Sequence, residues 1–138
     1  MTTILCIEDE VSLRADISEE LGDAGYNVKL AGDGEEGLEM ILKYQPDLVL
    51  CDITMPKKNG YALLSEIRGK YPLLAEMPFI FLSALTDKEL ILNGLKCGAD
   101  SYLTKPIDFE LLLTTIQTSL RQINRIKLKQ ERFLVLDI

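Results

Sequence analysis

The 138-residue chain contains no histidine and no tryptophan. Without histidine, the chain cannot build a histidine-based zinc site or use a histidine as a nucleophile. Any histidine that takes part in its chemistry must therefore belong to a partner. The 15 basic residues are outnumbered by 22 acidic ones, which gives a net charge of −7 and argues against a strongly basic nucleic-acid surface.

Cysteine is also scarce, with only Cys6, Cys51 and Cys97. Because the three are odd in number, widely spaced and set among apolar residues, they are typical of small reduced core residues and not of a disulfide framework. No apolar run approaches the roughly 18 residues of a membrane span, and the chain does not open with a signal peptide. We expect a soluble, cytoplasmic protein without membrane insertion.

The most informative stretch is residues 46–60, PDLVLCDITMPKKNG, in which the apolar run 48–51 ends at Asp52. A short, unbroken apolar run between turn-forming residues is typical of a strand buried on both faces, as in parallel sheets. In open α/β sheets, ligands bind outside the carboxyl ends of the strands, so Asp52 lies where chemistry is expected. Further strands are predicted over residues 3–8, 26–31, 79–82 and 101–103.

Amphipathic helices are predicted between these strands from apolar residues spaced three or four positions apart. The first begins at Val11 and is stopped by Gly25, which suits the left-handed conformation that follows many helices. The second ends before Pro46. Asn59 is expected to cap the third helix, since its side chain can accept a bond from a free backbone N–H.

The fourth helix, residues 87–97, is the weakest, because Gly94 costs about 1 kcal/mol relative to alanine in a helix interior. We therefore expect it to be comparatively mobile, and Gly98 to stop it. Asp108 is expected to cap a long final helix. Strand and helix thus alternate five times, which predicts a parallel sheet with helices on both faces and right-handed crossovers.

Such crossovers bring the carboxyl ends of all five strands to one edge, where polar residues gather. Three carboxylates about 4 Å apart, at an effective dielectric constant of roughly 20, would repel by about 4 kcal/mol per pair, so a cation should lie among them. Oxygen ligands without histidine favour Mg²⁺. Carboxylates, a divalent cation, a lysine and a hydroxyl together suit the binding of a phosphoryl group. Asp52 is placed to accept that group as an acyl phosphate. The predicted residues are Glu8, Asp9, Asp52, Ser83 and Lys105.

In kind, order and spacing, these motifs resemble the receiver domain of two-component response regulators over residues 3–121. The resemblance implies a flavodoxin-like five-stranded parallel sheet of order 2-1-3-4-5. It also implies that Asp52 takes a phosphoryl group from a phosphohistidine on a sensor histidine kinase or a histidine phosphotransfer protein, and that the domain is a regulatory phosphoacceptor, not an enzyme. The motifs are Glu8-Asp9, Asp52 in DITMPKKNG, Ser83-Ala84 and Lys105-Pro106.

The same resemblance implies several finer roles. The backbone carbonyl of Thr54 would help to hold Mg²⁺, and the Lys105-Pro106 bond would be cis. Tyr102 looks like the aromatic residue that rotates inward when Ser83 is drawn to the phosphoryl group. That movement would remodel the face made by the fourth helix, the fifth strand and the fifth helix. The alternative for Tyr102 is a half-buried strand residue without a switching role.

Two positions bear on how long the phosphoryl group would last. Leu85, two residues after Ser83, is apolar, and Thr54 carries no charge. We therefore hypothesise that an attacking water molecule is poorly positioned and that the acyl phosphate is long-lived.

Other classes of protein also fit parts of the pattern. A Mg²⁺-dependent phosphatase or phosphomutase forms an aspartyl phosphate too, but it usually carries a second acid two residues later, where this chain has Thr54. A protein-interaction adaptor that is never phosphorylated is another alternative, against which the intact acidic cluster argues. A flavin carrier is disfavoured, because the turn after the first strand is acidic and would repel a phosphate.

Residues 122–138 lie past the resemblance and are expected to form a helical extension or linker. The segment RQINRIKLKQER carries five basic residues and one acid, and Ile116, Ile123, Ile126 and Phe133 fall near heptad spacing. Three interpretations stay open: an extension leading to an output domain absent from this chain, a homodimer through the last helix, or a basic patch for nucleic acid or membrane. The receiver domain itself is not expected to bind nucleic acid.

Overall fold

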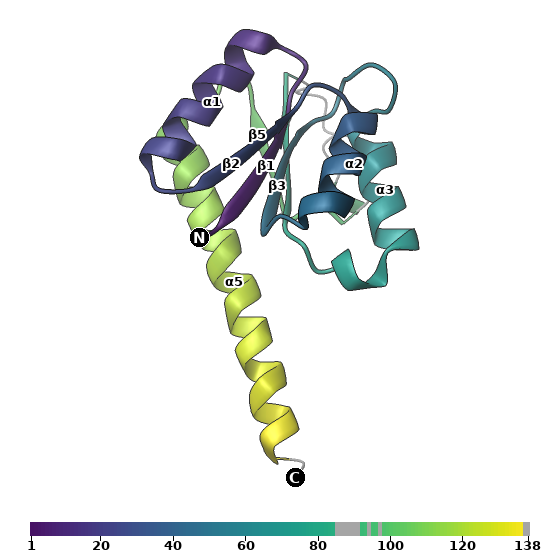
Figure 1. The fold of residues 1–138 in the computed structure, drawn as a ribbon, viewed down its shortest axis with the longest axis vertical. Helices are drawn as coiled ribbons and strands as arrows, with labels where there is room; N and C mark the ends of the chain where they lie inside the picture. Colours follow the sequence, from purple (N-terminus) through teal and green to yellow (C-terminus); the bar gives the residue numbers. More distant parts are fainter. Residues whose placement is uncertain (85–91, 94, 97, 137–138) are drawn as a thin grey trace.

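A computed structural model describes residues 1–84, 92, 93, 95, 96 and 98–136, and its centre is a five-stranded parallel sheet (Figure 1). The order β2-β1-β3-β4-β5 confirms the predicted order 2-1-3-4-5. The predicted strands are correct to within about one residue at each end. Their bounds are β1 (Thr3–Ile7), β2 (Asn27–Ala31), β3 (Leu48–Asp52), β4 (Phe79–Ser83) and β5 (Ser101–Thr104).

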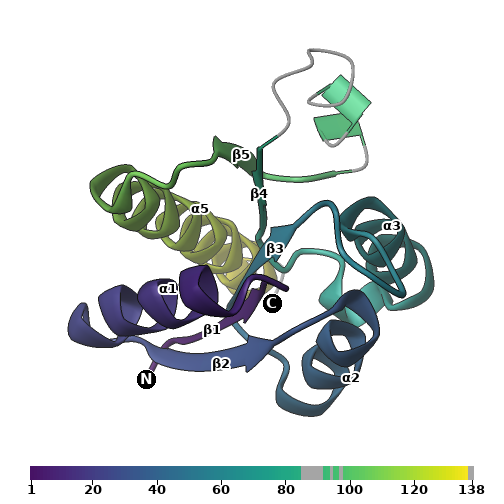
Figure 2. The same ribbon diagram turned by 90° about the horizontal axis from the view of Figure 1, so that it is seen from above.

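Helices cover both faces of the sheet (Figure 2). One face carries α1 (Val11–Asp23) and α5 (Phe109–Leu136), and the other carries α2 (Gly34–Tyr44) and α3 (Gly60–Lys70). A short 3₁₀ turn, η1 (Pro72–Leu74), follows α3. Most of the predicted fourth helix, including Gly94, lies outside the described residues, and its expected mobility is therefore not tested.

The alternation of side chains along the strands divides the core in two. In β1, Leu5 and Ile7 pack with the residues of α2 and α3, whereas Ile4 and Cys6 pack with those of α1 and α5. Every residue of β3 is buried, as predicted for a strand covered on both faces. Cys6 and Cys51 are buried free thiols, which confirms their assignment to the core, while Cys97 lies outside the described residues.

The helix boundaries follow from local signals in the sequence. The side chains of Asn59 and Asp108 each accept a hydrogen bond from the backbone N–H three residues later, at 2.9 and 3.1 Å, as predicted for caps. Gly25 follows α1 with a φ of 95°, the left-handed conformation expected there. Asp33 caps α2 in the same way as Asn59, at 2.9 Å, a cap that was not among those predicted although Glu36 three residues later is a signal for it.

Two glycines of α3 give opposite predictions for the same substitution. A Cβ on Gly60 would lie 2.6 Å from the carbonyl oxygen of Asp52 and 2.9 Å from the Phe81 ring, whereas a Cβ on Gly69 would meet nothing within 4 Å. Gly60→Ala should therefore lower the free energy of unfolding by about 1–3 kcal/mol through overpacking. Gly69→Ala should raise it by up to about 1 kcal/mol through helix propensity. Urea denaturation measures the free energy of unfolding of both variants. Changes of the same sign in the two variants would contradict the packing described for Gly60 and Gly69.

Candidate functional site

The carboxyl edge of the sheet brings together the residues that the sequence predicts for the site. Glu8 directly follows β1, Asp52 ends β3, Ser83 ends β4 and Lys105 directly follows β5. Glu8, Ser83 and Asp52 are only 0, 1 and 5% exposed, whereas Asp9 is exposed. Polar groups from four strands, widely separated in sequence, thus meet at one edge.

Lys105 lies between two carboxylates. Its Nζ is 3.0 Å from Oε1 of Glu8 and 3.3 Å from Oδ2 of Asp52. Its backbone N–H donates to the carbonyl oxygen of Ser83 at 2.8 Å, which fixes the start of the loop after β5. The Lys105-Pro106 peptide bond is cis, as the resemblance implied.

Burial sets the electrostatics of this edge. It raises the pKa of Glu8 and the pKa of Asp52, because the charged form of each loses solvent, and the hydrogen bonds and charge of Lys105 oppose this only in part. Burial lowers the pKa of Lys105, but its bonds to Glu8 and Asp52 and their charges outweigh burial and raise that pKa overall. Lys105 is therefore held in its protonated form. The single positive charge of Lys105 does not offset the cost of burying Glu8 and Asp52 as charged carboxylates.

The carboxylates could hold a divalent cation. Oxygen atoms of Glu8, Asp9 and Asp52 lie within 4.8 Å of one another. Oε2 of Glu8 is buried and has no hydrogen-bond partner among the described residues, a state that costs about 1–3 kcal/mol. A hard cation in the cluster would satisfy this oxygen, and the all-oxygen donor set suits Mg²⁺. Thr54, the predicted backbone ligand, lies two residues after Asp52 with an exposed side chain.

Ser83 and Tyr102 share one face of the sheet. Tyr102 in β5 pairs in register with Phe81 in β4 and packs, half-buried, against the core on the α3 side. Because alternate residues of a strand point to the same face, Ser83 lies on that side too. The two predicted switch residues therefore lie on the same side of neighbouring strands.

Two arginines make contacts that the sequence did not predict. Arg14 of α1 donates to the carbonyl oxygen of Glu8 at 2.9 Å. Arg68 of α3 donates to the carbonyl oxygens of Met77 and Gly98 at 2.8 and 2.9 Å, and so ties α3 to the segments that lead into β4 and β5. These partners are backbone atoms brought close by the fold, and no local spacing in the sequence indicates them.

Fold and site together define a flavodoxin-like α/β protein whose sheet edge carries an acidic, oxygen-donor site with one lysine and one serine. The family follows from sequence similarity. The sequence model of the response regulator receiver domain matches residues 4–117, and the chain belongs to this family.

Relatives of this chain include longer regulatory proteins. The transcriptional regulatory protein RprY of Bacteroides fragilis is 43% identical over 127 residues, which cover 92% of this chain and 52% of that protein. The DNA-binding dual master transcriptional regulator RpaA of Synechocystis is 36% identical over 126 residues, which cover 91% and 52% of the two chains. The chain therefore spans about half the length of these relatives.

Solved structures agree with the fold. The chemotaxis protein CheY4 of Vibrio cholerae matches with a TM-score of 0.81 and 33% identity, covering 86% of this chain and 98% of that one. The receiver domain of Francisella response regulator 1452 matches with a TM-score of 0.82 and 30% identity, covering 88% of this chain and 98% of that one. Within the described part of the chain, no helix combines the length and apolar character needed to cross a membrane.

The unbalanced charge of the cluster predicts an unusual effect of Asp52→Asn. Because the pKa of Asp52 is raised in the folded protein, wild-type stability falls as the pH rises through that pKa. Above it, in EDTA, the variant should be more stable than wild type by about 1 kcal/mol, since burial no longer has to desolvate a charged carboxylate at this position. At lower pH, where Asp52 is protonated, the difference should vanish.

Urea denaturation at a series of pH values measures this difference. Exposed Glu39 on α2 offers the matched control, and Glu39→Gln should change stability by less than about 0.5 kcal/mol. Adding Mg²⁺ should stabilise wild type more than Asp52→Asn, because binding to the folded state alone raises its stability. A variant less stable than wild type in EDTA at neutral pH would contradict the cost of burying the Asp52 carboxylate.

Proposed function

We propose that this chain is a phosphorylation-controlled signalling switch in which Asp52 accepts a phosphoryl group. The observation that carries the proposal is the position of the Asp52 carboxylate, 3.3 Å from Lys105 and clustered with Glu8 and Asp9. By its family, the chain takes this group from a phosphohistidine of a partner, either a sensor histidine kinase or a histidine phosphotransfer protein. The absence of histidine from the chain fits this division of labour. We place this exchange in the cytoplasm.

The transfer needs few groups from the protein. An oxygen of Asp52 attacks the phosphorus atom, a new O–P bond forms, and the P–N bond breaks, so that the partner's imidazole leaves with the electron pair. Lys105 lies where its ammonium can pair with a phosphoryl oxygen. We assign Mg²⁺ to the carboxylates of Glu8, Asp9 and Asp52 and the backbone carbonyl of Thr54. When bound, it neutralises negative charge on the phosphoryl group.

The readout of the phosphorylated state involves Ser83 and Tyr102. The Ser83 hydroxyl moves to the phosphoryl group, and Tyr102 follows inward on the same face of the sheet. The surface formed by the fourth helix, β5 and α5 changes as a result. This assignment is supported by the shared face of the two residues and by the half-buried position of Tyr102.

Two alternative functions are less well supported. A phosphatase or phosphomutase would need a general acid two residues after Asp52, where Thr54 has none to offer. An adaptor that is never phosphorylated would not need an unsatisfied buried oxygen on Glu8, since that atom costs stability. We therefore assign no enzyme activity beyond the chain's own phosphorylation and dephosphorylation.

We also propose a division of the chain. Residues 1–121 form the receiver domain, and residues 122–138 form an extension that leads to an output domain absent from this chain. Two observations support this division: the relatives RprY and RpaA are about twice as long, and both are named as transcriptional regulators.

Phosphorylation of Asp52 can be tested with a small acyl-phosphate donor and Mg²⁺. Wild type should gain the mass of one phosphoryl group, and Asp52→Asn should gain none. Asp33→Asn is the matched control, because Asp33 caps α2 outside the cluster and asparagine caps equally well. This control should label like wild type. Beryllofluoride should shift the amide resonances of Ser83 and Tyr102 in wild type only, and an equal response of Asp52→Asn would falsify the proposal.

The lifetime of the phosphorylated protein gives a further prediction. Thr54 carries no acid or base, and Leu85, which lies outside the described residues, is apolar, so water near the acyl phosphate lacks a positioning group. The label should survive desalting and gel filtration. Thr54→Glu adds a possible general base and should speed the loss of label by about tenfold or more, whereas Thr54→Ser should not. Loss of label from wild type as fast as from Thr54→Glu would contradict this explanation.

A further inference from the structure

Arg14 of α1 contacts the backbone of the acidic pair at the end of β1. Its Nη1 donates to the carbonyl oxygen of Glu8 at 2.9 Å. That oxygen belongs to the peptide group between Glu8 and Asp9, two neighbouring residues whose carboxylates form the cluster together with that of Asp52. Because a peptide group is planar, a hydrogen bond to its oxygen helps to fix the orientation of the whole group. The contact therefore bears on the direction in which Asp9 follows Glu8.

Glu8 and Asp9 differ in how they are held. The backbone N–H of Glu8 donates to the carbonyl oxygen of Ala31, at the end of β2, at 3.0 Å. Its side chain is buried and accepts from Nζ of Lys105 at 3.0 Å. Asp9, by contrast, is exposed, so packing constrains it less. Its carboxylate depends on the backbone that carries it, and Arg14 bonds to that backbone.

The place of the Arg14 guanidinium depends on Gly32, the residue after β2. A Cβ at Gly32 would lie 2.9 Å from Nη1 of Arg14, closer than side chains normally pack. The backbone of Gly32 is itself fixed, since its N–H donates to Oε2 of Glu36 in α2 at 3.1 Å. The missing side chain at Gly32 therefore leaves the space in which the guanidinium reaches the Glu8 carbonyl.

We propose that Arg14 is a positioning residue for Mg²⁺: by holding the peptide group between Glu8 and Asp9, it keeps both carboxylates in the geometry that binds the cation. The inference rests on the proposed function, which assigns Mg²⁺ to this cluster. Mg²⁺ demands near-ideal octahedral geometry, so a displaced ligand lowers its affinity. The positive charge of Arg14, on its own, repels a cation. Loss of the side chain should thus tighten Mg²⁺ binding if only the charge matters, and weaken it if the hydrogen bond matters.

NMR titration of the full chain with Mg²⁺, followed at the amide of Asp9, separates these two roles. Arg14→Leu removes the guanidinium and keeps a good helix former in α1. Its dissociation constant for Mg²⁺ should rise about tenfold, as is common when a group that orients a metal ligand is lost. Gly32→Ala keeps the positive charge but displaces the guanidinium, and it should weaken binding in the same direction. The double variant should bind no more weakly than Arg14→Leu, because both substitutions break one contact.

Gly22→Ala is the matched control, since Gly22 lies in the same helix as Arg14 and a Cβ there would meet nothing within 4 Å. It should leave the dissociation constant unchanged. A second readout is labelling by the acyl-phosphate donor. In Arg14→Leu the Mg²⁺ concentration that gives half-maximal labelling should rise by the same factor as the dissociation constant, and saturating Mg²⁺ should restore the wild-type level.

An unchanged or smaller dissociation constant in Arg14→Leu would overturn the proposal, and so would a Gly32→Ala variant that binds Mg²⁺ like wild type. If wild type were still labelled at Asp52 in either case, the proposed function would stand without this inference. A wild type that binds Mg²⁺ but is not labelled would instead remove the proposed function. The Mg²⁺ titrations would then still decide the role of Arg14.

Discussion

The burial of negative charge at the carboxyl edge is the constraint on which the rest of this structure depends. Glu8 and Asp52 are almost fully buried, and Lys105 lies within 3.3 Å of both. These groups come from the ends of β1, β3 and β5. The contact requires β1, β3 and β5 to run parallel, so that their carboxyl ends meet at one edge of the sheet. Two apolar layers, each packed on one face of the sheet, supply the stability that this edge lacks.

One lysine does not balance the cluster. The pKa values of Glu8 and Asp52 remain raised despite Lys105, and Oε2 of Glu8 lacks a partner among the described residues. A core optimised for stability alone would not retain such an atom. The unsatisfied oxygen is explained if the folded protein binds a cation there, because binding then repays the cost of burial.

Much of the fold could be predicted from local patterns. The apolar run before Asp52, the cap at Asn59 and the glycine after α1 each depend on residues close in sequence, and all three are confirmed. The convergence of Glu8, Asp52 and Lys105 could also be predicted, because parallel strands with right-handed crossovers place their carboxyl ends at one edge.

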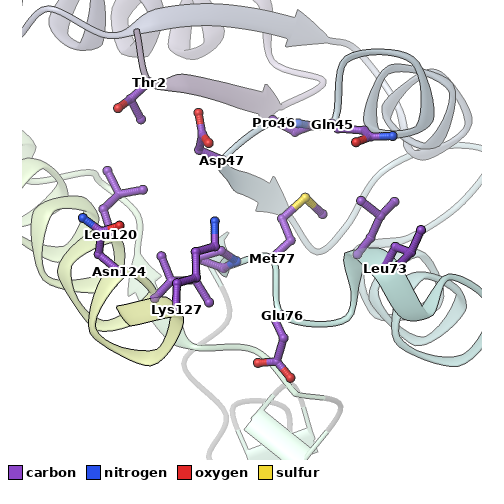
Figure 3. Close-up of a pocket in the computed structure, with 13 residues that line it drawn as sticks. Thr2, Gln45, Pro46, Asp47, Leu73, Glu76, Met77, Leu120, Asn124 and Lys127 are labelled. Carbon is purple, nitrogen blue, oxygen red and sulfur yellow. The ribbon is translucent and has the colours of Figure 1, made fainter. Parts of the chain in front are cut away.

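Contacts between side chains and distant backbone atoms could not be predicted. Arg14 meets the carbonyl of Glu8, and Arg68 meets carbonyls on two segments, only because the fold brings these atoms together. The cap at Asp33 is a different kind of miss, since Asp33 with Glu36 three residues later is a helix-start signal in the local sequence. The groove opposite the acidic edge is the extreme case, since its lining comes from four separate stretches of chain: Thr2 and residues 45–47, 73–78 and 120–127 (Figure 3).

Helix α5 connects the two ends of the molecule. It begins at Phe109, four residues after Lys105, and it ends beyond the opposite edge of the sheet (Figure 1). At that end a groove is lined by η1 and by residues 120–127 of α5, well before the helix ends at Leu136. One unbroken helix therefore runs from just after the acidic edge to well past the core.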